Sequence, residues 1–73
     1  MSEFVKVSEN VFVDELDVKQ AFELAENRLS VLEFDVPQYV VEFTLESVLK
    51  LNKFSHLSSF EKKAIVDYIV ENY

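Results

Sequence analysis

The chain has 73 residues, of which 49% are hydrophobic, and a formal net charge of −7. That length allows one domain at most, and that apolar content excludes a disordered segment. Because it has no cysteine and no glycine, the chain cannot form a disulfide, a thiolate zinc site or a glycine-rich phosphate-binding loop, and its acidic excess argues against direct binding to nucleic acid or to an anionic membrane.

Residues 1–13 are rich in β-branched and aromatic side chains, so their strand propensity is high. Ser8, Glu9 and Asn10 fit the three-residue loop of a β-hairpin, with Asn10 in the left-handed conformation that asparagine tolerates well. An isolated hairpin is marginal in water, so this one must pack on the helices or pair with another copy. The alternative is a first helix that extends back to Asn10, and the pattern favours the two equally.

Residues 14–33 have the periodicity of an amphipathic helix. Its apolar face consists of Val18, Ala21, Phe22, Ala25, Leu29 and Leu32. The opposite face is mainly acidic, and the segment carries most of the net negative charge of the chain. Leu24 and Val31 lie outside the main stripe and widen the apolar arc to about half of the circumference, which one neighbouring helix cannot cover.

A second helix is predicted over 37–53, after the break at Asp35, Val36 and Pro37. The residue before a proline avoids the α region, whereas proline itself fits a first helical turn, and Asp35 is the expected N-cap. The polar residues of 37–53 form one narrow strip, and apolar side chains occupy most of the remaining circumference. We therefore predict that this helix is central and buried.

The stretch 54–68 holds the only histidine, His56, among serines and acids, which are the residue types of a nucleophilic active site. The chain has no Gly-x-Ser-x-Gly elbow and no glycine for an oxyanion loop, so we interpret His56 as a residue of an interhelical loop. Ser58 and Glu61 instead match a capping box, which predicts a third helix over 59–71.

The predicted fold is mainly α: a single domain over 1–73 with three helices, the second of them central and buried, and an N-terminal extended segment or short β-hairpin. Such a small domain does not easily hide all the apolar residues of its first and third helices. Surplus apolar area beside an acidic face favours a protein-binding surface. The residues predicted to form it are Glu15, Glu23, Glu26, Glu33, Leu24, Val31, Val66, Val70 and Tyr73.

We therefore expect a small, acidic, non-enzymatic protein that binds a protein partner with a basic surface, as a regulator, inhibitor or assembly factor. One alternative is a structural homo-oligomer, such as a homodimer, whose apolar stripes meet. Another is an acidic mimic of nucleic acid that blocks a nucleic-acid-binding protein. No catalytic residue, metal ligand or cofactor is expected. The lack of cysteine and of any long apolar run indicates a cytoplasmic protein without a membrane segment.

Overall fold

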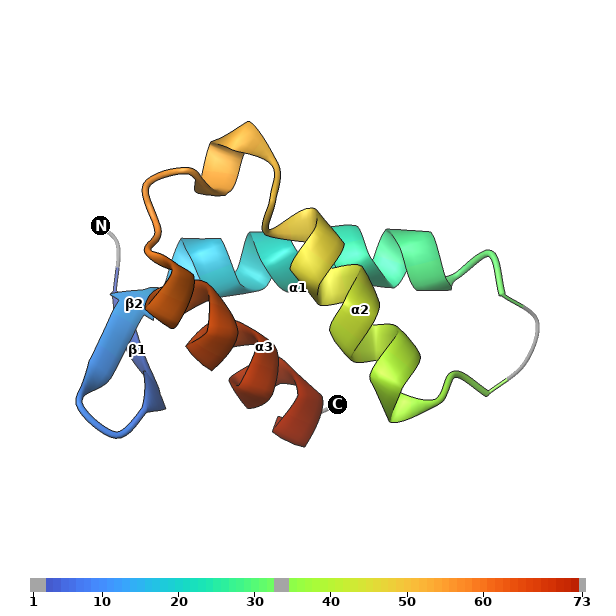
Figure 1. Ribbon diagram of the computed structural model, residues 1–73, viewed down its shortest axis with the longest axis horizontal. Coiled ribbons are helices and arrows are strands. Elements are labelled where there is room, and N and C mark those ends of the chain that lie inside the picture. The colour runs from blue at the N-terminus through green and yellow to red at the C-terminus, as the bar shows by residue number, and fades with distance from the viewer. Residues whose placement is uncertain (1–2, 33–34, 73) are drawn as a thin grey trace.

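The structure is a computed structural model that describes residues 3–32 and 35–72. It has an N-terminal hairpin and three α-helices, which confirms the predicted three-helix fold (Figure 1). The elements in chain order are β1 (Phe4–Ser8), β2 (Val11–Asp14), α1 (Glu15–Leu29), α2 (Gln38–Val48), the 3₁₀ turn η1 (Asn52–Phe54) and α3 (Ser59–Asn72).

β1 and β2 pair as an antiparallel hairpin, so the alternative of a helix that extends back to Asn10 is wrong. Asn10 has a φ of 62°, as predicted for the turn. The loop is one residue shorter than expected because Ser8 pairs with Val11, and the register shifts between Lys6 and Ser8. Both strands pack against α3, and β2 also contacts α1, so the hairpin belongs to the same core as the helices.

α1 begins where the side chain of Asp14 caps it: Oδ1 accepts a hydrogen bond from the amide of Leu16 at 2.9 Å. It buries Ala21, Ala25 and Leu29, all three from the predicted apolar face. The helix ends at Leu29, four residues before the predicted end of 33.

The central burial of the second helix is not confirmed. α2 buries Val41, Leu45 and Val48 along one face, whereas Tyr39 and Phe43 on another face are 72% and 69% exposed. Figure 1 shows α2 and α3 on the same side of α1, with the hairpin at the end where α1 begins. α2 therefore has neighbours on one side and solvent on the other.

Both ends of α2 differ from the prediction. Pro37 is the N-cap residue rather than the first helical residue, and no side chain caps this end, so Asp35 does not have the expected role. The helix stops at Val48 rather than near 53, and the 3₁₀ turn η1 follows. This change of direction places Phe54 in the core, where it is fully buried.

α3 begins with the predicted capping box. The amide of Ser58 donates to Oε1 of Glu61 at 2.8 Å, and the amide of Glu61 donates to Oγ of Ser58 at 3.1 Å. The helix then contributes Ala64, Ile65, Val66 and Ile69 to the core. Among the described residues, no polar or charged side chain is buried, so the core is entirely apolar.

Candidate protein-binding surface

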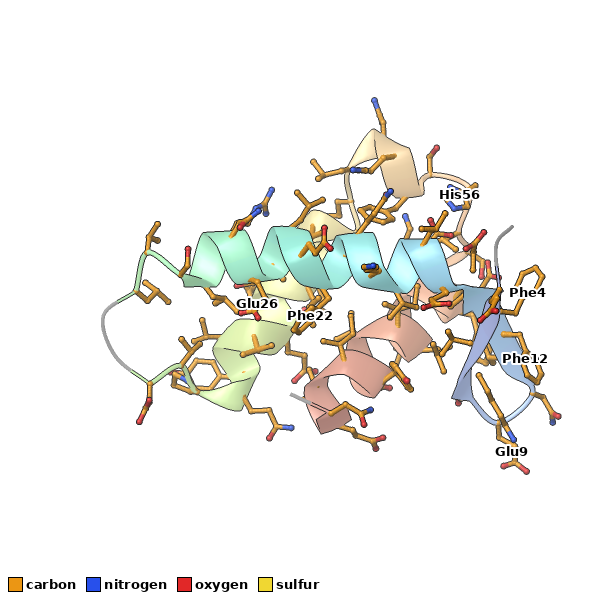
Figure 2. All side chains as sticks on the ribbon, turned by 180° about the vertical axis from the view of Figure 1, so that it is seen from behind. Phe4, Glu9, Phe12, Phe22, Glu26 and His56 are labelled. Atoms are coloured by element: carbon orange, nitrogen blue, oxygen red, sulfur yellow. The ribbon has the colours of Figure 1, made fainter. Side chains whose placement is uncertain are left out.

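The outward face of the hairpin carries two exposed phenylalanines. Side chains alternate along a strand, so the valines that enter the core leave Phe4 and Phe12 facing away from it. Phe4 pairs with Asp14 and Lys6 pairs with Phe12, which makes the two rings diagonal neighbours on one face. They are 71% and 57% exposed, and Figure 2 shows both at the same edge of the molecule. Clustered exposed aromatic residues are typical of a contact surface.

A surface hollow of about 440 Å³ adjoins these two rings, which form part of its lining. The buried side chains of Val13 and Leu57 and the 54% exposed side chain of Leu16 add further apolar atoms. We call Phe4, Phe12, Leu16 and this hollow the hairpin surface. It joins the hairpin and the first turn of α1, which follow each other in the sequence, to the distant loop before α3.

Three half-buried carboxylates, those of Asp14, Asp17 and Glu61, also line the hollow. One oxygen of each accepts an intramolecular hydrogen bond. The donors are, in the same order, the amide of Leu16 at 2.9 Å, Nε2 of His56 at 2.8 Å and the amide of Ser58 at 2.8 Å. The second oxygen of each carboxylate accepts no hydrogen bond from the described part of the chain. The hollow is therefore lined by three oriented carboxylates, each with one oxygen that can accept a hydrogen bond from a ligand.

His56 lies in the loop between η1 and α3, as predicted. Its side chain is 55% exposed and donates from Nε2 to Asp17, whose side chain is 15% exposed. The nearby Ser58 hydroxyl accepts the amide of Glu61 in the capping box. Asp17 and Ser58 thus have structural partners. That His56 serves no catalytic site stays a prediction.

The acidic residues predicted for the binding surface lie along α1. Glu15, Glu23 and Glu26 are all exposed. Figure 2 shows Glu26 one helical turn from Phe22, on the side of α1 that faces α2. Glu33 lies outside the described residues.

The apolar residues predicted for the surface differ in how far they are exposed. Val66 is 4% exposed and belongs to the core, so little of its side chain is available to a partner. Leu24 and Val70 are partly buried and pack against the core. Val31 is 76% exposed just beyond α1. Tyr73 lies outside the described residues. Of the apolar predictions, Val31 alone within 3–32 and 35–72 is largely exposed.

Sequence reasoning placed none of the largely exposed aromatic side chains of the described residues on the surface, namely Phe4, Phe12, Tyr39, Phe43 and Phe60. Phe4 and Phe12 were readable from the alternation in the strands, which puts them opposite the valines. Tyr39 and Phe43 were assigned to a buried helix, yet they lie one turn apart on the outer face of α2. With Glu42 and Glu46 they line a second hollow of about 470 Å³. Nothing in the local pattern distinguishes the covered face of such an apolar helix from the exposed one.

Within 3–32 and 35–72, no three His, Cys, Asp or Glu side chains lie where they could share a metal ion. The described helices include none that is long and apolar enough to cross a membrane. Comparison of the chain with protein-family models, with curated proteins and with solved structures found no match.

Proposed function

We propose that this protein binds another protein through the hairpin surface and acts as a regulator, inhibitor or assembly factor, without catalysing a reaction. The observation that carries the proposal is the exposure of Phe4, Phe12 and Leu16 on elements anchored in the core. Aromatic side chains have few rotatable bonds and lose little conformational entropy on binding. Such residues supply much of the affinity in protein interfaces when they become desolvated.

The charge of the surface selects the class of partner. Asp14, Asp17 and Glu61 adjoin the apolar patch, and the whole chain has a net charge of −7. Negative groups repel a phosphate backbone or an anionic lipid headgroup and attract a basic protein surface. Glu15 and Glu23 on α1 extend the negative potential and would steer such a partner. In this proposal the partner is a basic protein and the complex forms in the cytoplasm.

Capture of partners from the native cell with two matched variants tests the proposal. Phe4→Ser/Phe12→Ser removes the hairpin aromatics, and Tyr39→Ser/Phe43→Ser removes a pair from α2 that is at least as exposed. Wild type and the α2 variant should retain the same partner, whereas the hairpin variant should lose it. Calorimetry with the purified partner should show binding at least about tenfold weaker for the hairpin variant.

Circular dichroism must show that both variants stay folded. Equal capture by both variants, or loss of the partner in the α2 variant alone, contradicts the proposal.

Self-association is the competing function, because the chain exposes aromatic pairs both on the hairpin and on α2. Light scattering over a wide concentration range distinguishes the two. A monomer at all concentrations agrees with a separate partner. A dimer that Phe4→Ser/Phe12→Ser dissociates would assign the hairpin surface to a homo-oligomer instead. Nucleic-acid mimicry additionally requires that the captured partner bind DNA or RNA in competition with this chain.

A further inference from the structure

We propose that the hollow of the hairpin surface receives an arginine side chain from an apolar segment of the partner. The inference rests on the proposed function and deepens it by naming the chemistry that the site recognises. In this arrangement the guanidinium meets the carboxylates of the hollow, and the flanking apolar side chains of the segment rest on Phe4, Phe12 and Leu16.

Charge complementarity is the first argument. Asp14, Asp17 and Glu61 line the hollow, and no lysine or arginine does. Lys6 lies on the same face of the hairpin, opposite Phe12, but outside the lining. The basic group that does line the hollow is the imidazole of His56, which bonds Asp17. A cationic side chain that enters the hollow is therefore attracted by three acids and meets no lysine or arginine in the lining. Because the acids are half-buried, salt screens this attraction less than it screens fully exposed charges.

The hydrogen-bonding geometry favours arginine over lysine. Each of the three carboxylates is already oriented by one intramolecular hydrogen bond and keeps its second oxygen free of partners in the described chain. A guanidinium has five N–H donors in a planar fork and can address several carboxylate oxygens together. An ammonium group is a compact charge with three donors and matches fewer of them. Pre-oriented acceptors also reduce the ordering cost of binding.

The apolar part of the lining favours the same side chain. Phe4 and Phe12 expose their rings beside the carboxylates, and a guanidinium stacks on an aromatic face more readily than an ammonium does. Val13, Leu16 and Leu57 offer apolar contact to the methylene stem of an arginine. The combination of acids with exposed rings therefore points to arginine rather than to a generic cation.

A peptide titration tests the inference. The probe is a capped pentapeptide with one arginine between leucines, and its controls carry lysine or citrulline, an uncharged analogue of arginine, at that position. ¹⁵N-edited NMR spectra should show saturable shifts around Leu16, Asp17 and Glu61 with the arginine peptide. The citrulline peptide should bind at least about tenfold more weakly, since it lacks the charge. The lysine peptide should fall between them.

Isosteric amide variants test the role of the acids without removing the caps. The variant is Asp14→Asn/Asp17→Asn/Glu61→Gln. The asparagine at 14 still caps α1, and the amide oxygen of the asparagine at 17 still accepts a hydrogen bond from His56. The glutamine at 61 still completes the capping box with Ser58. Compared with wild type, this variant should bind the arginine peptide at least about tenfold more weakly, whereas its affinity for the citrulline peptide should be about the same as that of wild type. The control Glu42→Gln/Glu46→Gln/Glu71→Gln removes the same number of charges from exposed positions on α2 and α3 and should change the affinity less than about twofold.

Three results overturn the inference: no saturable binding of the arginine peptide, equal affinity for the citrulline peptide, or equal losses in the two amide variants. None of these results contradicts the proposed function, because that proposal has a separate test: whether Phe4→Ser/Phe12→Ser loses the captured partner. Self-association through Arg28, the one arginine of the chain, is a separate outcome. It would appear as dimerisation that Arg28→Gln abolishes. The arginine in the hollow would then come from a second copy of this chain and not from a different protein.

Discussion

Asn10 has a φ of 62° in the turn between β1 and β2. In this left-handed region most residues with a Cβ are strained, whereas glycine is not and asparagine is only mildly so. Because the chain has no glycine, the turn depends on Asn10. The register of the hairpin follows from the turn, and the register places Phe4 and Phe12 on the same face. One backbone conformation thus contributes to the hairpin surface.

Substitutions at Asn10 distinguish the contribution of its backbone conformation to stability from that of its side chain. Asn10→Ala should lower the free energy of unfolding by about 1 kcal/mol, because alanine tolerates positive φ poorly. Asn10→Gly should leave that free energy nearly unchanged. Urea denaturation followed by circular dichroism measures both. If the two variants lose the same stability, the contribution of Asn10 comes from its side chain and not from its φ.

At the scale of elements, α2 and η1 show that the same residue type can be exposed in one element and buried in the next. Phe43 on α2 is 69% exposed, whereas Phe54 in η1 is fully buried. α2 stops at Val48, and the chain turns so that Phe54 enters the core together with Leu45 and Leu49. The end of the helix is thus coupled to a tertiary contact, since a continuous helix to 53 would carry Phe54 in another direction.

The two phenylalanines should respond very differently to truncation. Phe54→Ala should cost about 3–5 kcal/mol, which is comparable to the whole stability of so small a domain and should unfold it at 25 °C. Phe43→Ala should change stability by less than about 0.5 kcal/mol. Thermal unfolding followed by circular dichroism measures the difference. A folded Phe54→Ala variant with a melting temperature near that of wild type would contradict the packing described above.

For the whole molecule, charge and apolar surface are arranged along one direction. The hairpin surface lies at the end of the molecule where α1 begins, as the labelled Phe4 and Phe12 show in Figure 2. Glu15 and Glu23 are exposed farther along the chain, on α1. Exposed acids of this kind act at long range and are screened within about 8 Å at physiological salt. Their contribution belongs to the encounter with a partner, whereas the apolar contacts determine how long the complex lasts.

Charge reversal on α1 should therefore change the rate of association rather than that of dissociation. For Glu23→Lys/Glu26→Lys we expect association with the captured partner to slow by about threefold or more at low salt, with little change in dissociation. The difference should nearly vanish at about 0.5 M salt, because the charges are then screened. Stopped-flow or surface-plasmon measurements give both rates. A changed dissociation rate that persists at high salt would place these glutamates inside the interface.

The sequence by itself determined the local features of this protein. The capping box of Ser58 and Glu61 depends on residues within a few positions of one another, and the structure has it. The left-handed turn at Asn10 was one of two alternatives that the sequence left open, and the structure has that one. The number and type of the helices also follow from local periodicity. The absence of cysteine and glycine from the whole sequence excludes disulfides and glycine-rich loops regardless of the fold.

Only the tertiary structure decided which apolar faces are covered. Val66 and Phe43 are both apolar helical residues, yet one is in the core and the other faces solvent, because α2 packs against α3 on one side only. The hairpin surface is likewise a tertiary product: it joins Phe4 from β1, Asp17 from α1 and Glu61 from α3 around one hollow. Periodicity shows that a side chain is on a given face of its helix, but burial depends on the neighbour that packs there, and that neighbour comes from a distant part of the chain.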